Sequence, residues 1–360
     1  MPNFINDRGR GTVEAPPNRF EKLTFESDDA AWEEISKIDP DFENERPRTE
    51  VFRDDSQSII SKNSSPDLGF DASLNPYRGC EHGCAYCYAR PSHEYLGMNA
   101  GLDFESKIMA KLNAPDLLER EISAGKWIPQ NLACSGVTDC YQPIERKFKI
   151  TRGCLEVLSR ARHPVGIVTK NALVTRDIDL LSELAHYNCS AVSISLTSLD
   201  ADVAAKLEPR ASHPNARLRA IRELSEAGIP VGVSTAPIVP GLNDHEIPAL
   251  LEAAADHGAS FASFTVVRLP YAVKDIFTSW LERFFPDRKE LILGRIREMR
   301  GGKLNESDFA TRMRGDGIVA EQIAQLFTVS SARAGLNRGR VKLSTDHFRK
   351  LMPGGQGELF

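Results

Sequence analysis

The sequence predicts an α/β protein in which six βα units form an open, partial (β/α)6 barrel with a helical C-terminal extension. From about residue 72, apolar β-branched runs alternate with amphipathic stretches, a spacing typical of parallel strands joined by helices. Six units are two fewer than a closed eight-stranded barrel needs. The 360 residues, 41% of them hydrophobic and 26% charged, suffice for one large barrel with its own core.

The strands are expected where apolar and β-branched residues run together. The expected strands are Ala72–Tyr77, Gln130–Val137, Val165–Thr169, Ala191–Leu196, Val231–Ile238 and Phe261–Val267. The expected helices are Ile108–Ser123, Arg152–Ala161, Asp177–His186, Ala201–Leu207, Asn215–Ala227 and Asp244–His257.

Segments of different composition flank this barrel, which is expected over residues 56–270. Residues 1–55 form an acidic arm, with fifteen Asp and Glu against eight Lys and Arg, and little fixed structure is expected before about residue 20. One short helix is expected around Asp29–Ile38. Residues 271–350 form the extension, expected to be helical over 270–330 and basic over 295–350, where twelve Lys and Arg face six Asp and Glu. Residues 351–360 are expected to be a flexible tail.

Charge and hydropathy exclude some classes of protein. A net charge of −5 and a pI near 6.0 argue against non-specific coating of nucleic acid, although a local basic site is compatible with them. The N-terminal residues lack the apolar core of a secretory signal, and no apolar run is long enough to span a membrane. We therefore expect a cytoplasmic protein without a membrane partner, whose seven cysteines are ligands or reactive thiols more than disulfides.

The strongest motif is a run of three cysteines, Cys80-x3-Cys84-x2-Cys87. Three thiolates from one short loop can bind three corners of a cubane 4Fe-4S cluster, and Gly79 and Gly83 let the backbone wrap closely. One iron then lacks a protein ligand, and an open coordination position is what a catalytic metal site needs.

Other uses of these cysteines fit less well. A structural zinc site wants four ligands, usually from paired CxxC elements, and the spacing of Cys134 and Cys140 is wrong for a second pair. His82 offers a fourth ligand, but it lies between the thiolates and no second knuckle follows. A disulfide is disfavoured by the reducing compartment. A second cluster would require Cys134, Cys140, Cys154 and Cys189 to converge, which nothing local indicates.

The motif, with Tyr86 just before its last cysteine, resembles the radical S-adenosylmethionine (SAM) superfamily. The segments NPYRGC, VTDCYQPIE, RHPVGIVTKN and GIPVGVSTAPIVPGLND resemble its spore-photoproduct-lyase-like branch, also called DNA repair photolyase, over about residues 55 to 340. The resemblance implies a TIM-like radical SAM barrel with a 4Fe-4S cluster whose open iron binds SAM. One electron, from a donor such as flavodoxin or ferredoxin, then cleaves SAM to methionine and a 5′-deoxyadenosyl radical that removes hydrogen from substrate.

The same resemblance implies cofactor contacts at the C-terminal ends of the strands. Tyr86 would place its backbone beside the adenine, Thr138 and Asp139 would bind the methionyl ammonium, and Lys170 would meet the carboxylate. The alternatives are that Thr138 and Asp139 cap the following segment and that Lys170 is a surface lysine.

Strand ends further along the chain would complete the cofactor site. Ser193, Ser195 and Thr197 alternate onto one strand face, where Ser195 or Thr197 would meet the ribose. This polar face is unusual because parallel strands are usually apolar on both sides. Ile238, at the end of the next strand, would pack against adenine. Arg210, Arg217 and Glu145 are open between solvated positions and ligand contacts.

Cysteines also provide candidates for catalysis. In the lyase branch a cysteine near the second strand donates a hydrogen atom to the substrate radical, and Cys134 and Cys140 lie in that region. The alternative is that Cys134 is a small core residue, as we expect for Cys154 and Cys189.

The tail suggests one macromolecular partner. Gln356, Leu359 and Phe360 resemble the peptide by which bacterial repair and replication proteins bind the sliding clamp, and the alternative is a frayed terminus.

Three functional hypotheses follow. The first is a radical enzyme acting on nucleic acid, such as a DNA repair lyase acting on a damaged base, which would have to be extruded from a duplex. The second is a radical enzyme acting on a protein, peptide or small metabolite. The third is a non-catalytic iron–sulfur or zinc scaffold, which would not cleave SAM.

Overall fold

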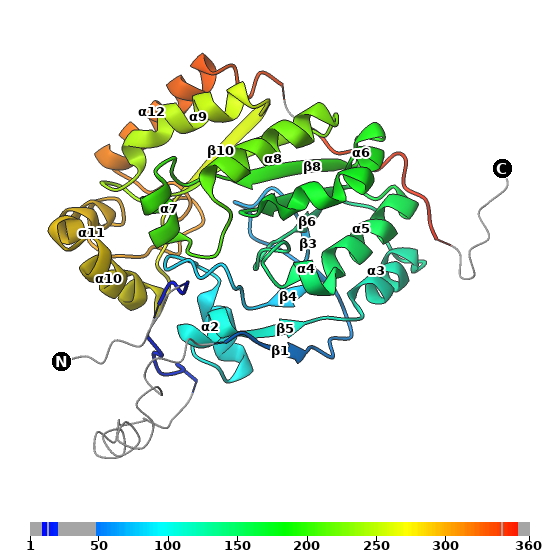
Figure 1. Cartoon of the computed structure of the whole chain (residues 1–360), viewed down its shortest axis with the longest axis horizontal. Helices are drawn as coiled ribbons and strands as arrows, with labels where there is room; N and C mark the ends of the chain where they lie inside the picture. Colours follow the sequence, from blue (N-terminus) through cyan, green and yellow to red (C-terminus); the bar gives the residue numbers. More distant parts are fainter. Residues whose placement is uncertain (1–8, 13, 21–47, 340, 352–360) are drawn as a thin grey trace.

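The computed structural model describes residues 9–12, 14–20, 48–339 and 341–351, and its centre is a seven-stranded sheet (Figure 1). The strand order is β10-β9-β8-β7-β6-β3-β2. Strands β3, β6, β7, β8, β9 and β10 are parallel, and β2 pairs antiparallel with β3 at the edge. The bounds are β2 Ile60–Lys62, β3 Ala72–Leu74, β6 Leu132–Cys134, β7 Val165–Thr169, β8 Ser190–Ser195, β9 Val231–Ile238 and β10 Phe261–Val266. Six parallel strands in chain order confirm the predicted open, partial barrel.

Helices follow the strands and cover the outer face of the sheet (Figure 1). Their bounds are α3 Ala114–Ser123, α4 Glu145–Phe148, α5 Ile150–Ala161, α6 Ile178–His186, α7 Ala201–Leu207, α8 Pro214–Glu226 and α9 Ile247–Asp256. The longer helices α3, α5, α6, α8 and α9 each pack an apolar stripe against the strands, as their amphipathic patterns require. Short 3-10 turns or helices add η2 Arg90–Leu96, α2 Leu102–Ser106, η3 Ala172–Asp177, η4 Asp244–Glu246 and η5 Pro286–Arg288.

One predicted helix, Ile108–Ser123, is wrong in its first part. Residues Lys107–Ala110 are strand β5, whose side chains at 108 and 110 are buried while those at 107 and 109 are less so. This alternation is the period of a strand, and Pro115 then suits the first turn of α3. Strand β5 pairs with β1 Glu50–Arg53 and β4 Tyr77–Arg78 in a three-stranded sheet that the sequence did not indicate.

The acidic arm is more ordered near its start than expected. Among its described residues, Arg10, Thr12 and Asn18 are buried. The expected helix at 29–38 and the tail residues Gln356, Leu359 and Phe360 lie outside the described residues.

The C-terminal extension is helical only in part. Its helices are α10 Val273–Phe284, α11 Lys289–Glu298 and α12 Ile318–Arg333, and α12 lies over α9 (Figure 1). The expected helix over 299–317 is wrong, because this segment forms turns in which Gly301, Gly302, Gly315 and Gly317 adopt positive φ.

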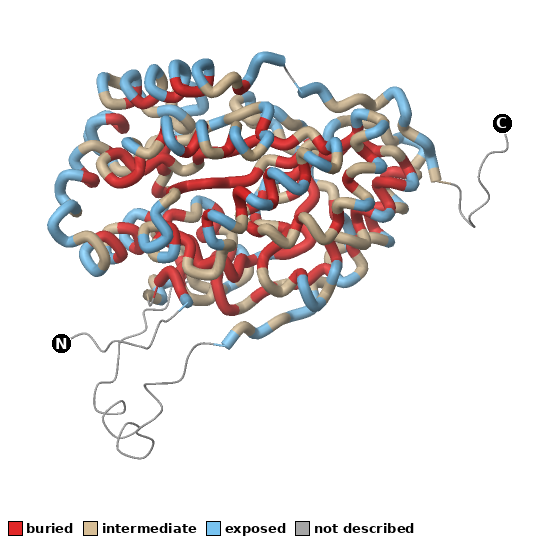
Figure 2. Tube along the Cα trace, turned by 45° about the horizontal axis from the view of Figure 1, so that its top comes forward, coloured by how far each residue is buried: buried red, intermediate tan, exposed pale blue. Residues whose placement is uncertain are grey.

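The inner face of the sheet is lined by small residues. Along β7 and β8, the outward-facing Val165, Ile167 and Val192 are fully buried, whereas the inward-facing side chains are small or partly exposed. The small inner residues include Ala133, Gly166, Ala191, Ser193 and Ser234. A closed barrel fills this space with bulky side chains. Here the small side chains leave a cavity of about 1040 Å³. The buried residues gather in the middle of the structure, shown in red in Figure 2.

Within the described residues, no helix is both long enough and apolar enough to cross a membrane.

His163 predicts a pH dependence of stability. It is buried between Trp127 and Phe348, its Nδ1 lies 3.1 Å from the Pro164 carbonyl oxygen, and its Nε2 accepts from Trp127 Nε1 at 3.2 Å. This arrangement suits the neutral ring, since a proton on Nε2 would oppose the indole N–H. Burial lowers the pKa of His163 from 6.5 to about 4.

Because the folded-state pKa is below the unfolded one, this histidine's contribution to stability is present above pH 6.5 and is lost as pH falls towards 4. Through this group, the wild type should lose about 3 kcal/mol of unfolding free energy on acidification to pH 4. His163→Gln should not show this loss. Urea denaturation of wild type and variant from pH 4 to pH 7 measures it. Equal slopes in the two proteins would contradict the neutral, buried ring.

Candidate active site

The cysteine loop lies at the C-terminal ends of the strands and faces the interior cavity. Cys80, Cys84 and Cys87 all line this cavity and are free thiols, the first two buried and the third half-buried. Gly79 and Gly83 adopt φ of 78° and 68°, so the close wrapping expected of these glycines is present. The loop therefore presents three thiols to one space.

These thiols fit a cubane cluster better than a single metal ion. Among the described residues, no three His, Cys, Asp or Glu side chains lie close enough together to hold one ion, as a zinc site would require. A 4Fe-4S cluster instead binds each thiolate to a different iron. Burial raises the pKa of Cys84 and Cys87, so without iron these groups are neutral thiols facing the cavity.

Asp139 fixes the cysteine loop to two strand ends. Its carboxylate lies 3.3 Å from His82 Nδ1 and accepts from Thr169 Oγ1 at 2.7 Å, from the Lys170 backbone N–H at 2.8 Å and from the Tyr141 N–H at 2.9 Å. These four contacts position the Asp139 carboxylate, which also lines the cavity. Its expected role in binding the methionyl ammonium stays a prediction.

The charges of this pair stabilise each other. Burial favours the neutral forms, but Asp139 and Cys80 raise the pKa of His82 to about 10, and His82 holds the pKa of Asp139 at about 2. A buried ion pair of this kind holds one arrangement of the loop, because separating it would leave an uncompensated charge.

A second buried pair lies on the other side of the loop. Glu208 lies 2.5 Å from Arg217 Nη2, accepts from the Tyr86 hydroxyl, and is 4.0 Å from Lys170 Nζ. Burial opposes the charge of Glu208, yet Arg217 and Lys170 keep its pKa lowered. Arg217 is therefore not a solvated helix residue. Sequence reasoning missed Glu208, whose partners are distant in the chain.

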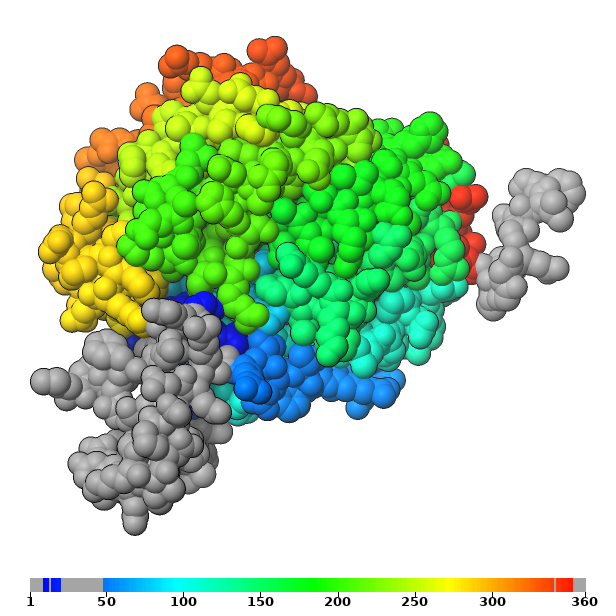
Figure 3. Space-filling view, in the orientation of Figure 1, coloured from blue at the N-terminus to red at the C-terminus, as the bar shows by residue number. Residues whose placement is uncertain are grey.

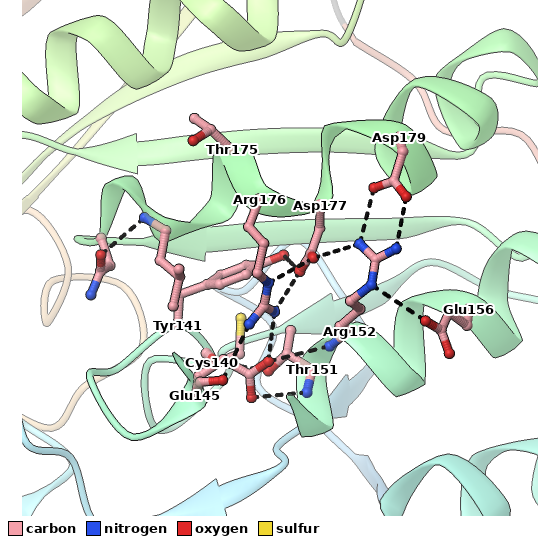
Figure 4. A network of polar contacts seen from close by, with 12 residues as sticks. Cys140, Tyr141, Glu145, Thr151, Arg152, Glu156, Thr175, Arg176, Asp177 and Asp179 are labelled. Carbon is pink, nitrogen blue, oxygen red and sulfur yellow. Dashed lines mark hydrogen bonds and ion pairs between the residues drawn. The ribbon is translucent and has the colours of Figure 1, made fainter. Parts of the chain in front are cut away.

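The loop after β6 rests on a third buried network (Figure 4). Glu145 accepts from the Tyr77 hydroxyl at 2.5 Å, from the Thr151 N–H at 3.1 Å and from Arg176 Nη2 at 2.7 Å. Asp177 accepts from Arg152 Nη1 at 2.9 Å and from the Tyr141 hydroxyl at 3.0 Å. Glu145, which the sequence left open, is therefore a buried support for the segment that carries Cys140.

The remaining expected cofactor residues divide into two groups. Tyr86, Thr138, Lys170 and Ser195 line the cavity, although Thr138 Oγ1 already donates to the Tyr77 carbonyl at 2.8 Å. Thr197 and Ile238 are buried but are not among the cavity-lining residues. Instead, Ala236 and Pro237 of β9 contribute to the wall, together with Ser193 of β8.

The two candidate hydrogen-donor cysteines occupy different positions. Cys134 lines the cavity at the end of β6. Cys140 is buried beneath it, where burial and the neighbouring Cys134 raise its pKa. Cys154 and Cys189 are buried in the apolar core, as expected.

Comparison with known proteins identifies the family. Residues 74–254 match the family model described as the radical SAM superfamily. The chain belongs to this superfamily. It is a radical SAM enzyme, which uses a 4Fe-4S cluster and SAM and needs an electron donor.

Two other comparisons found similar proteins. The uncharacterised protein Rv2578c of Mycobacterium tuberculosis is 33% identical over 64% of this chain and 68% of its own length. The uncharacterised protein MJ0683 of Methanocaldococcus jannaschii is 29% identical over 61% of this chain and 78% of its own. Spore photoproduct lyase complexed with dinucleoside spore photoproduct superposes with a TM-score of 0.57 over 79% of this chain and 80% of that chain, at 17% identity. This last likeness is one of fold.

Residues 9–12 and 14–20, the N-terminal strap, pack against the cysteine loop from outside. The Gly11 N–H donates to Glu105 Oε2 at 2.9 Å, and Glu105 also pairs with the buried Arg90, whose Nε donates to the Cys84 carbonyl at 2.9 Å. In Figure 3 the dark-blue strap lies beside the yellow C-terminal helices, where Arg19 is 4.0 Å from the Tyr271 ring. The strap thus covers the outer side of the loop.

A substitution at Gly11 tests whether the N-terminal strap protects the cysteine loop. A Cβ at Gly11 would lie 1.4 Å from the Gly83 carbonyl oxygen, so Gly11→Ala must displace the strap or the loop. We expect a loss of about 1–3 kcal/mol in unfolding free energy and faster loss of cluster absorbance in air. Gly125→Ala, at a glycine with no atom within 4 Å of the added Cβ, is the matched control. Equal behaviour of the two variants would show that the strap does not seal the loop.

Proposed function

We propose that this enzyme abstracts a hydrogen atom from a nucleic-acid substrate, such as a damaged base, in a lyase-like repair reaction. The observation that carries the proposal is the shared space of the three thiols and a cavity of about 1040 Å³. That volume, at the upper end of ligand pockets, favours a cofactor and a second molecule lying side by side. When bound, the cluster and SAM supply the radical that begins the reaction.

The chain's own residues position and enclose the reactants. Lys170, whose side chain is 19% exposed, offers an ammonium to a carboxylate in the cavity, and the hydroxyls of Ser193 and Ser195 offer hydrogen bonds to a ribose. Cys134, a cavity-lining residue at the end of β6 whose side chain is packed into the core, is the cysteine that we assign as hydrogen-atom donor to a substrate radical. Cys140 is buried and is not a cavity-lining residue, so we assign it only a secondary role.

Two observations favour nucleic acid over a peptide or small metabolite. The similar fold of a lyase whose solved complex contains a dinucleoside photoproduct is one. Arginines next to an exposed aromatic ring at the cluster end of the cavity are the other. Flavodoxin or ferredoxin as electron donor, a cytoplasmic location and binding of the sliding clamp through Gln356, Leu359 and Phe360 remain predictions from the sequence.

The radical chemistry is tested by anaerobic cluster reconstitution followed by addition of dithionite and SAM. Wild type should form 5′-deoxyadenosine, and Cys84→Ala should form at least about a hundredfold less, because a lost thiolate ligand disrupts the cluster. Chromatography measures the product, and absorbance near 400 nm measures the cluster.

Cys189→Ala is the matched control, since Cys189 is a buried cysteine remote from the cavity lining. It should retain both cluster and product. Absence of product from wild type with an intact, reducible cluster, in the presence and absence of damaged DNA, would contradict the proposed function and favour a scaffold.

A further inference from the structure

Arg268, just after β10, is a charged side chain in the cavity wall that forms no ion pair within the described part of the chain, although Asp67 is near enough to favour its charge. It lines the cavity close to the cysteine loop, with its guanidinium 4.8 Å from the Tyr88 ring. Its only hydrogen bond among the described residues is a contact of 3.5 Å from Nη1 to Met313 Sδ, and no carboxylate of these residues pairs with it. A guanidinium has five N–H donors, so most of its capacity is unused.

Two further arginines, Arg312 and Arg300, add positive charge around Arg268. Arg312, which also lines the cavity, is close enough to Arg268 to disfavour its charge, and Arg268 in turn disfavours the charge of Arg300. Arg312 binds Asp67 through two hydrogen bonds of 2.5 and 2.6 Å, whereas Arg300 donates to the backbone carbonyls of Val267 and Thr311. Asp67 is thus the single carboxylate paired with these three arginines in the described part of the chain.

A purely structural role for Arg268 explains this poorly. Burial and the neighbouring Arg312 lower the pKa of Arg268 by more than Tyr88 and Asp67 raise it, so its charged form is destabilised where it stands. Stacking on Tyr88 offsets part of this cost. A leucine or methionine would fill the same space without a desolvated charge. The arrangement is therefore costly to the free protein and becomes favourable when an anion occupies the site.

The neighbouring surface indicates which anion. The Tyr88 ring is 48% exposed, and Val137 beside it in the wall is 42% exposed. An exposed aromatic ring next to two neighbouring arginines suits a phosphate with an attached base. The base can stack on the ring while the phosphate oxygens accept hydrogen bonds from a guanidinium. A carboxylate of an acidic peptide would use the arginines but not the ring.

We propose that Arg268 and Arg312 form a phosphate subsite at the cluster end of the cavity, with Tyr88 as the stacking surface for the adjoining base. This inference deepens the proposed function and rests on its assignment of a nucleic-acid substrate. The subsite holds the phosphodiester beside the reacting nucleotide, so the sugar–phosphate backbone fixes which residue faces the cofactor.

Binding of a fluorescent single-stranded oligothymidylate to the cluster-reconstituted full chain tests the subsite without turnover. Anisotropy titrations at several salt concentrations should show at least about tenfold weaker affinity for Arg268→Gln, and a smaller dependence of log Kd on log salt by about one unit. Arg268→Lys should recover part of the affinity. Near-ultraviolet circular dichroism and cluster absorbance establish that the variants are folded.

Arg314→Gln is the matched control, because Arg314 is an exposed arginine of the same segment that stacks on Phe264 and does not line the cavity. It should bind the oligonucleotide as wild type does. Inorganic phosphate and thymidine monophosphate as competitors separate the phosphate from the base, and stronger competition by the nucleotide is expected.

Equal affinity of Arg268→Gln and wild type would overturn the subsite, as would tighter binding of an acidic peptide than of the oligonucleotide. The proposed function fails separately, through absence of 5′-deoxyadenosine from wild type. An enzyme that cleaves SAM but binds oligonucleotide independently of Arg268 therefore refutes this inference alone.

Discussion

The active site depends on buried ion pairs that hold a short cysteine loop in one conformation. His82 and Asp139 attach the loop to the ends of β6 and β7, and Glu208 and Arg217 hold the Tyr86 side of it. Such pairs contribute little net stability, because desolvation offsets much of their attraction. Their effect is specificity, since an altered loop would leave a buried charge unpaired. The three thiols therefore line one cavity.

The second constraint is the small size of the inner strand residues. Ala133, Gly166 and Ala191 cannot fill the barrel, and the outer faces supply the apolar burial that keeps the sheet stable. Polar groups such as Ser193 are tolerated inside because the cavity gives them access to solvent or ligand. Stability and catalysis are thus assigned to opposite faces of the same strands. The cysteine loop and Arg268 come from distant parts of the chain, and both line one end of this cavity.

The sequence predicted most of the barrel because periodic burial is a local property. Strands β7 and β9 and helix α7 have the expected bounds, and the cysteine spacing with its glycines identified the cluster loop. The β1-β5-β4 sheet was missed because its strands are short and distant in sequence. Position at a strand end likewise did not reveal that Asp139 turns towards His82, or that Glu208 and Arg217 meet in the interior. Those outcomes depend on contacts between remote residues, for which no motif exists.

The central claim is that the three-cysteine loop leaves one iron of the cluster open to SAM within the cavity. Electron paramagnetic resonance of the reduced wild-type enzyme, recorded with and without saturating SAM, tests it directly. SAM should change the g values of the cluster signal, because a new ligand binds the fourth iron. A fully reduced, intact cluster whose spectrum is identical with and without SAM would contradict it.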